Sequence, residues 1–499
     1  MITLIGGEMP EYAEQRPPAG GPLYRRLIDR LPTGIRVLIA GPHSGALVRA
    51  VADRREITLL LRSRPDAERV DVRDVRVLCG TLSKLADTDR YDAVIALDGT
   101  GRLHSPEGPP LDWVESVRVL RKALRPGGTL LLAVENELGV HRLVDPGTPT
   151  AARAGDAWYP LGEFGSAPGR PDRLAAALGA EGLKVAALAA VWPLPEHPAL
   201  LATPETLRYG PLDALAALAS AAAAPAYRER SVLSDPRRLA AAAVRRGLGA
   251  ELAPAWLAVA QLATRPGQAV PLPPALIAGP GGAVTELVKS PDGAWSRRAV
   301  QGPGELTGPL PSGRLLEERL LTAALGHDLP GLRRLLTGWM TELPNVPAGN
   351  VLVDGDRYAR LDPSAPDRAD ALARFAHTLA TGGYHHPWPG VTDVARLTDV
   401  LAGAAGLTTA PTPAPTAGDE LPDIRRRHEE QLDAVRRRLA DAEDRVRFYE
   451  VELGKREAEL GRAKVQIAAF SGSLGYRAAK AGLGIARAAR NRIRNRGSQ

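Results

Sequence analysis

The chain has 499 residues, more than one ordinary hydrophobic core supports, so its length predicts two or three domains. The single cysteine, Cys79, excludes a disulfide framework and a cysteine-based zinc site. No uncharged apolar run reaches the roughly 20 residues that a membrane-spanning helix needs. Glu8, Glu11 and Glu14 interrupt any signal-peptide pattern near the start. We therefore expect an intracellular, cytoplasmic protein.

The net charge of +7 is unevenly distributed along the chain. No Asp or Glu follows Glu459, and the last 40 residues carry nine Lys and Arg. Much of the basic character therefore belongs to a tail, at 471–499, and not to the body of the protein.

Five apolar runs alternate with helix-like stretches between residues 34 and 135. They are Arg36–Ala40, Ile57–Leu61, Val75–Cys79, Ala93–Leu97 and Thr129–Val134. Such alternation predicts the α/β class, with a doubly wound parallel sheet covered by helices on both faces. Residues 1–33 precede this pattern as an N-terminal extension. Helix and strand patterns continue to residue 263, so the first domain spans 34–263.

A segment rich in proline and glycine, 264–282, has the composition of a linker. The pattern after it, 283–405, predicts a smaller α+β domain. This domain has two hairpins that turn at Asp292-Gly293 and Asp354-Gly355.

A second linker is expected at 406–420, where Thr, Pro and Ala dominate. Beyond it, mostly apolar residues recur at spacings of three and four across 421–470. Among them are Val435, Leu439, Val446, Leu453, Leu460 and Ile467. This heptad pattern predicts a coiled coil and therefore a homodimer, the alternative being one long solitary amphipathic helix.

Three motifs of the first domain occur in a meaningful order. They are Val37-Leu38-x-x-Gly41-x-x-x-Gly45, Tyr91-Asp92-Ala-Val-Ile-Ala-Leu-Asp98-Gly99 and Leu124-Arg-Pro126-Gly127-Gly128-Thr-Leu-Leu-Leu. Together they resemble class I S-adenosylmethionine-dependent methyltransferases, closely over 34–140 and loosely over 141–263. The resemblance implies a Rossmann-like fold that binds S-adenosyl-L-methionine. Its glycines let backbone amides and a helix N-terminus approach the cofactor.

The sequence departs from this family where side chains normally hold the cofactor. Ile39 stands where an acid commonly begins the first motif, and His43 replaces its middle glycine. Leu61, followed by Arg62, lies where the family has its ribose-binding acid, and Thr81 replaces the usual acid after the third strand. Each missing hydrogen-bond partner costs about 1–3 kcal/mol. The sequence therefore leaves two interpretations open, a working cofactor site and a fold that has lost its cofactor.

The resemblance assigns cofactor and catalytic roles residue by residue. The expected cofactor-binding residues are Gly41, His43, Gly45, Arg62, Thr81 and Asp98. The candidate bases for methyl transfer are Asp98, His104 and His141. The structural alternatives are a turn cap before Gly99 for Asp98 and surface positions for the two histidines.

Residues Glu135-Asn-Glu-Leu-Gly139-Val-His141-Arg-Leu also resemble bacterial methyltransferases found with surface-glycan synthesis genes. That resemblance implies a sugar or cell-surface glycan precursor as the methyl acceptor.

The second domain contains a segment with the spacing of another family. Asn350 and Asp362 match the two Mg²⁺ ligands of aminoglycoside-phosphotransferase-type kinases, which this segment resembles. The catalytic base is replaced by Asn345, which implies a degenerate kinase-like module. Lys289 is its candidate phosphate-contacting lysine, with Glu317 or Glu318 as partner. An unrelated hairpin is the alternative.

Two further features complete the sequence. Adjacent His385 and His386 point to opposite faces of an extended chain, so we predict a structural loop and no metal site. The basic tail fits an anionic membrane surface better than nucleic acid, because Tyr476 is its sole aromatic residue for base stacking; a solvated tail is the third option.

The leading prediction is a dimeric cytoplasmic methyltransferase, peripheral at the inner membrane face. Its rival is a non-catalytic scaffold that assembles glycan-synthesis enzymes through the coiled coil.

Overall fold

The protein is described by a computed structural model. The structure describes residues 2–88, 90–145, 166–228, 230, 232–262, 272–302, 307–381, 384–391, 393–407, 423–472 and 474–496. The chain divides into two compact units, Met1–His428 and Glu429–Gln499.

Five parallel strands form the centre of the main sheet. They are β2 (Arg36–Ala40), β3 (Glu56–Leu61), β4 (Val75–Gly80), β5 (Tyr91–Ala96) and β6 (Leu124–Glu135). Their order in the sheet is β4-β3-β2-β5-β6, which is the 3-2-1-4-5 order of a doubly wound Rossmann sheet. The five predicted strands are therefore confirmed. One detail differs, since β6 begins at Leu124 and includes the Pro126-Gly127-Gly128 turn.

Further strands flank this parallel centre on both sides. Strand β9 (Ala255–Leu262) pairs antiparallel with β6, and β7 (Leu183–Trp192) pairs antiparallel with β9. At the opposite edge, β1 (Ile2–Gly6) pairs in parallel with β4. The predicted N-terminal extension thus contributes an edge strand to the sheet.

Helices cover both faces of the sheet. One face carries α1 (Pro22–Asp29), α2 (Gly45–Ala52) and α3 (Arg64–Glu68). The other carries α4 (Trp113–Lys122), α5 (Val140–Val144), α6 (Pro171–Ala180), α7 (Pro204–Tyr209), α8 (Leu212–Ala226) and α9 (Pro236–Arg245). Because successive strand residues face opposite ways, Leu38 and Ala40 of β2 join one core while Val37 and Ile39 join the other.

The sheet continues beyond the first domain that the sequence predicted. Short strand β8 (Leu200–Ala202) links β7 to β10 (Ala275–Ala278), and β11 (Val284–Lys289), β12 (Trp295–Gln301) and β13 (Gly308–Pro309) follow. The described residues thus form a sheet of 13 strands. Part of the predicted linker at 264–282 lies outside the described residues. Its segment Ala275–Ala278 is a strand and not linker, because the apolar Ala-Leu-Ile-Ala pairs with both neighbours. Prolines and glycines on either side hid this strand in the sequence.

A helical cluster with its own core completes the first unit. It consists of α10 (Leu316–Leu325), α11 (Leu329–Glu342), α12 (Ala371–Thr381) and α13 (Val394–Ala404), with the small antiparallel sheet β14 (Arg314–Leu315), β15 (Val351–Asp354) and β16 (Arg357–Arg360). Both predicted hairpins are present, and Gly355 turns the second with a φ of +61°. Leu315, Leu352 and Leu361 pack against Ala214 and Ala217 of α8, which joins this cluster to the first half of the chain.

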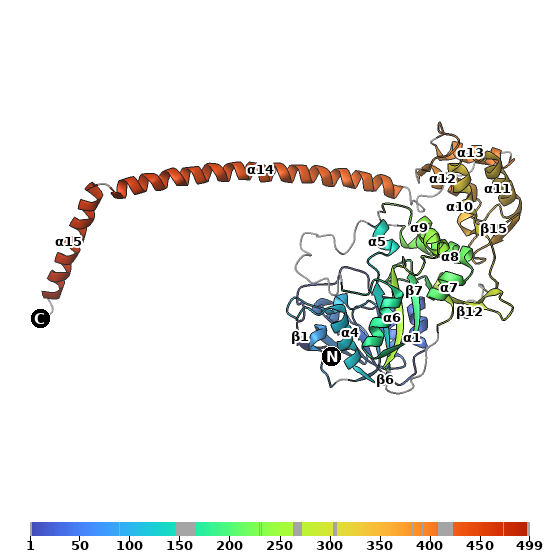
Figure 1. Cartoon of the computed structure of the whole chain (residues 1–499), viewed down its shortest axis with the longest axis horizontal. Helices are drawn as coiled ribbons and strands as arrows, with labels where there is room; N and C mark the ends of the chain where they lie inside the picture. Colours follow the sequence, from blue (N-terminus) through green and yellow to red (C-terminus); the bar gives the residue numbers. More distant parts are fainter. Residues whose placement is uncertain are drawn as a thin grey trace. The chain divides into compact units, whose positions relative to one another are not determined.

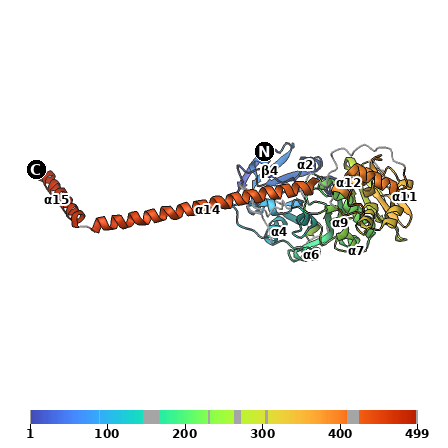
Figure 2. The same ribbon diagram turned by 90° about the horizontal axis from the view of Figure 1, so that it is seen from above.

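The second unit is helical. Figures 1 and 2 show α14 (Asp423–Gly472) as one unbroken helix, which α15 (Leu474–Arg496) follows. The heptad residues Val435, Leu439 and Leu453 are exposed on α14; whether they pair with a second chain stays a prediction. Most of the predicted linker at 406–420 lies outside the described residues. Within the described residues, no helix combines the length and apolarity needed to cross a membrane.

Candidate functional site

The turn after β2 keeps the backbone shape that its glycine implies. Gly41 has a φ of +88°, a conformation that side chains with a Cβ rarely adopt. A Cβ there would also contact Leu103 and Asp98 at 3.6 and 3.7 Å. Ser44 caps the following helix, its hydroxyl accepting a hydrogen bond from the Leu47 amide at 3.3 Å. Gly45 is the first residue of α2, beside the Arg49 guanidinium.

His43 fills the space between this turn and the end of β5. Its Nδ1 lies 2.9 Å from the Gly41 carbonyl, and its Nε2 accepts a hydrogen bond from the Leu97 amide at 3.2 Å. The ring therefore donates through Nδ1 and accepts through Nε2, which is a neutral tautomer. Burial, together with the charge of Arg102, lowers the pKa of His43 to about 4. The residue in place of the family's middle glycine is thus a buried, neutral packing element.

The N-terminal segment, residues 8–21, lies across the carboxyl ends of β2 and β3. The Ser44 amide donates to the Ala19 carbonyl at 2.8 Å, and the Ala19 amide donates to the Pro42 carbonyl at 3.2 Å. Further along, the Met9 amide donates to the Arg62 carbonyl at 2.8 Å. A backbone amide that the resemblance offers to a cofactor is therefore already bonded within the chain.

Arg62, directly after β3, forms a buried ion pair with the N-terminal segment. Its Nε lies 2.7 Å from a Glu14 oxygen and a terminal nitrogen lies 3.3 Å from the other, while the remaining nitrogen donates to the His104 carbonyl at 2.8 Å. The guanidinium also lies over the ring of Tyr12. The side chains of Arg62 and Glu14 are only 2% and 7% exposed. The position where the family has its ribose-binding acid is thus covered by protein.

Asp98, at the end of β5, is paired just as completely. Two guanidinium nitrogens of Arg102 donate hydrogen bonds to the Asp98 carboxylate. The same guanidinium donates to the carbonyls of Arg16 and Pro17 at 2.9 Å each. Burial raises the pKa of Asp98 to about 6, and the charge of Arg102 opposes this rise. Asp98 is therefore paired with Arg102, which in turn is bonded to the N-terminal segment.

The remaining predicted residues lie in separate buried positions. Thr81 donates to the Leu103 carbonyl at 3.2 Å and packs against Gly7. His104 lies against α4, its Nε2 3.1 Å from the Ser116 hydroxyl, and burial lowers its pKa to about 4. His104 is therefore a core residue, so the surface alternative is wrong for it.

His141 joins an ion-pair cluster at the end of β6. Its Nε2 lies 2.9 Å from the Glu135 carboxylate, which also contacts Arg142 at 3.0 Å and Arg16 at 3.4 Å. Although burial opposes ionisation, the hydrogen bond from His141 and the charges of Arg16 and Arg142 hold the pKa of Glu135 well below its usual range. Next to this cluster is a cavity of about 20 Å³, lined in part by Asp98, Glu135 and Glu196.

The structure thus brings together Gly41, His43 and Asp98, and places Arg62 under the same N-terminal segment. Sequence reasoning missed the partners Glu14 and Arg102. Arg102 stands four residues after Asp98, a spacing that suits ion pairs on helical turns. Glu14 is 48 residues from Arg62 and gave no local signal.

In the second half, the kinase-like residues are arranged differently from what the sequence suggested. Glu317 pairs with Arg237 at 2.9 Å and Glu318 with Arg245 at 2.5 Å. Lys289 lies instead over the ring of Trp295. The expected Lys289–Glu pair is therefore wrong, because α9 supplies the cations that neutralise α10.

Asn350 and Asp362 do lie together. The Asn350 side chain donates to the Asp362 carbonyl and accepts from the Asp362 amide, both at 2.8 Å. Among the described residues, no group of three His, Cys, Asp or Glu side chains has the arrangement of a metal site.

The chain matches no protein-family model and no curated protein sequence. Among solved structures it is similar to the methyltransferase bound to the Trm112 activator of Haloferax volcanii, with 18% identity over 49% of this chain and 90% of that one, at a TM-score of 0.30. It is also similar to the 1,6-didemethyltoxoflavin-N1-methyltransferase of Burkholderia thailandensis, with 16% identity, coverage of 48% and 76%, and a TM-score of 0.26. A third similar structure is the [4+2]-cyclase SpnF, with 14% identity, coverage of 53% and 88%, and a TM-score of 0.27.

These similarities are too distant to support an argument by themselves, and the strand order identifies the fold. A 3-2-1-4-5 parallel sheet followed by reversed β9 and then β7 is a Rossmann-like sheet of the class I methyltransferase kind. The first half of the chain therefore has a methyltransferase-like fold. Fold does not determine function, and the function must be argued from the site.

Proposed function

We propose that this chain is a non-catalytic protein with a methyltransferase-like fold, in which the N-terminal segment takes the place of the cofactor. One observation carries the proposal: the buried Arg62–Glu14 pair at the end of β3, where the family has its ribose-binding acid. The Ser44–Ala19 hydrogen bond and the Arg102 contacts hold the same segment in place.

The energy of these contacts sets the expected effect on cofactor affinity. Leaving one member of a buried ion pair without its partner costs about 3–5 kcal/mol. A cofactor that must first displace the segment binds more weakly by about tenfold for each 1.4 kcal/mol. Breaking the Arg62–Glu14 pair alone therefore lowers the affinity by about a hundredfold to a thousandfold or more.

The two C-terminal helices supply the proposed assembly role. The heptad residues of α14 are exposed as a row of apolar side chains, which pairing in a parallel dimer would bury. Helix α15 carries seven Lys and Arg and no acid, which suits an anionic membrane surface. A dimeric scaffold at the inner membrane face, holding glycan-synthesis enzymes, is the role that fits both helices.

Calorimetry with S-adenosylhomocysteine on the full chain tests the absence of a working cofactor site. The expected result is no binding heat at millimolar ligand. Micromolar affinity in the wild-type protein would overturn the proposal.

Sedimentation measurements on two α14 variants test the dimer. Leu453→Asp places a charge in the heptad row and is expected to give monomers. Val451→Asp is the matched control, because Val451 is equally apolar and exposed but lies outside that row. Equal dissociation by both variants, or a monomeric wild-type protein, would contradict the coiled-coil assignment.

The second candidate function is S-adenosylmethionine-dependent methyl transfer to a sugar or glycan precursor. The glycine conformation at Gly41 and the strand order favour it. It requires the N-terminal segment to leave the ends of the strands. Glu14→Lys repels Arg62 and releases the segment, so this function predicts that the variant gains cofactor affinity. Glu11→Lys is the control, since Glu11 is exposed.

A further inference from the structure

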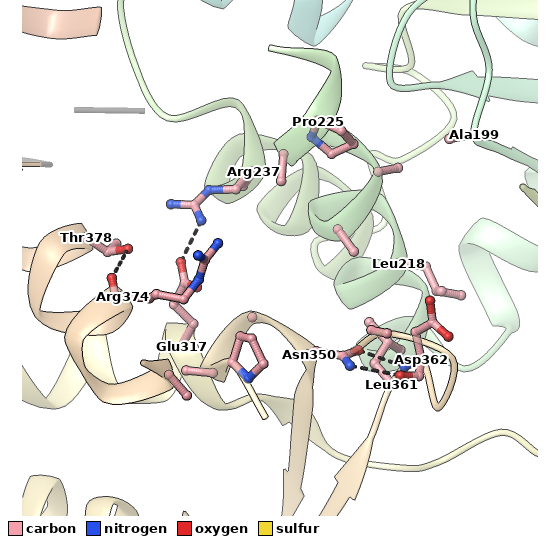
Figure 3. Close-up of a pocket in the computed structure, with 18 of the residues that line it drawn as sticks. Ala199, Leu218, Pro225, Arg237, Glu317, Asn350, Leu361, Asp362, Arg374 and Thr378 are labelled. Atoms are coloured by element: carbon pink, nitrogen blue, oxygen red, sulfur yellow. Dashed lines mark hydrogen bonds and ion pairs between the residues drawn. The ribbon is translucent and has the colours of Figure 1, made fainter. Parts of the chain in front are cut away.

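A cavity of about 450 Å³ lies in the first unit, between the helices of the methyltransferase-like half and the α10–α13 cluster (Figure 3). Helices α8 and α9 form one wall, and α12 together with the segment around Asn350 and Asp362 forms the other. Volumes of about 300–1,000 Å³ are typical of pockets that take small molecules. The cavity is separate from the predicted cofactor site, and its lining includes Glu317, Asn350 and Asp362 of the predicted kinase-like segment.

The charged side chains of this cavity are mainly positive. Four arginines line it, from α9, α12, β12 and the turn after α8, against two carboxylates, Glu317 and Asp362. Charged groups buried in protein need partners of opposite sign. Two of these arginines have carboxylate partners just outside the lining, with Asp235 at 3.1 Å from Arg237 and Asp370 at 3.8 Å from Arg374.

Two of these arginines are neutralised by the protein. Figure 3 shows Arg237 and Arg374 converging on Glu317 from opposite sides of the cavity. Arg237 lies 2.9 Å from Glu317 and 3.1 Å from Asp235, so it has two carboxylate partners. Burial raises the pKa of Glu317, and the charge of Arg237 opposes this rise. This end of the cavity is an internally balanced ion-pair cluster.

Arg297 of β12 is different. Its guanidinium donates to the carbonyls of Leu361 at 2.6 Å and Pro309 at 3.3 Å, and its buried Nε has no hydrogen-bond partner among the described residues. The residue is 8% exposed, and burial lowers its pKa although Asp362 lies near. Arg297 thus places a buried cation, held by neutral carbonyls, at the cavity wall.

The α8 side of the cavity is apolar. Leu218, Ala221, Ala222 and Ala224 of α8 line it, and Ile277 of β10 adds an apolar side chain from the sheet that also holds Arg297. Asp362, which also lines the cavity, already accepts two hydrogen bonds from Ser364 through Oδ1. A molecule with an anion at one end and a carbon skeleton at the other matches a cavity that offers a cation and an apolar surface.

We propose that this cavity binds a small organic phosphate monoester, whose phosphate contacts Arg297 and whose organic part lies along α8. Arginine presents a fork of donors that suits phosphate oxygens. The proposal is independent of whether the first half binds a cofactor.

The test is calorimetry on the full chain with phenyl phosphate as probe, compared with inorganic phosphate and benzoate. Phenyl phosphate is expected to bind at least about tenfold more tightly than either comparison ligand, since it alone combines a dianion with an apolar group. Absence of binding at millimolar phenyl phosphate overturns the proposal. Equal binding of benzoate overturns the choice of phosphate.

Three variants locate the site. Arg297→Gln is expected to weaken phenyl phosphate binding by at least about tenfold. Ala222→Phe fills the apolar side without removing a charge and is expected to block binding equally, which keeps the test valid should Arg297→Gln unfold. Arg333→Gln removes one exposed positive charge of α11, outside the cavity, and should bind like the wild type. Unchanged binding in Ala222→Phe, or in a folded Arg297→Gln, contradicts the assignment.

Discussion

Buried arginines of the first unit have different hydrogen-bond partners in two regions. At the carboxyl ends of β2, β3 and β5, Arg62 and Arg102 each donate to a carboxylate and to carbonyls of the same chain. In the cavity beside α8, Arg297 donates to two carbonyls, with the charge of Asp362 near. The comparison shows that a familiar fold does not mark the place where a ligand binds. The region that resembles a cofactor site is filled, and the region without a sharp motif has an open cavity.

The largest expected effect on stability comes from removing Arg62, the arginine that closes the predicted cofactor site. Arg62→Ala leaves the buried Glu14 carboxylate without its main partner, which should lower the free energy of unfolding by about 3–5 kcal/mol. Chemical denaturation measures it. Arg64→Ala is the control, because the Arg64–Glu68 pair is exposed to solvent and should contribute little to stability. Similar losses in both variants would contradict the structural role of Arg62.

The next effect concerns acid stability. Burial lowers the pKa of His104 to about 4, below the 6.5 of the unfolded chain. The unfolded state therefore binds a proton first, and the stability that His104 contributes above pH 6.5 is lost as the pH falls towards 4. Between pH 7 and pH 5 this amounts to about 2 kcal/mol. Asp98, whose pKa burial raises to about 6, acts in the opposite direction over part of this range.

Comparing variants isolates the contribution of His104. Between pH 7 and pH 5, His104→Gln should lose about 2 kcal/mol less unfolding free energy than the wild type loses. His385→Gln, in an exposed loop, should leave the difference as in the wild type. Denaturation curves at the two pH values would contradict the prediction if His104→Gln behaved like His385→Gln.

A smaller effect is expected where the N-terminal segment packs most closely. A Cβ at Gly20 would lie 2.7 Å from the Ser44 hydroxyl oxygen, so Gly20→Ala forces the segment away from α2. Such crowding costs about 1–2 kcal/mol. Gly169→Ala, which meets nothing within 4 Å, is the control. Thermal unfolding would disprove the close packing if both alanine variants were equally stable.

The smallest effect is expected in the open cavity. Ala222→Leu adds three carbons to a helical residue that faces existing space, so stability should change by less than about 0.5 kcal/mol. A loss as large as that of Gly20→Ala would mean that the cavity is filled in solution. The pair of substitutions therefore compares a closed region with an open one directly.

The central strands could be predicted because their signal is local. Arg36–Ala40 and its parallel neighbours are buried on both faces, so each is a short continuous apolar run between helical stretches. The same holds for the hairpin turn at Gly355, whose positive φ needs glycine or a small polar residue.

The closing of the predicted cofactor site could not be foreseen. The N-terminal segment is held by backbone hydrogen bonds, as at Ala19, and backbone groups leave no pattern in a sequence. Arg62 was predicted to bind the cofactor from its position after β3, but its partner Glu14 is distant along the chain. Strand β10 was missed for another reason, since flanking prolines and glycines suggested a linker while strand pairing supplied the order.

The 13-stranded sheet has a consequence for how this protein comes apart. Strands β8 and β10 join both halves in one sheet, and Arg245 of α9 pairs with Glu318. A cut near residue 263 would therefore leave a strand edge without its partner and Glu318 without its arginine. The two halves of the first unit should therefore unfold in one cooperative transition.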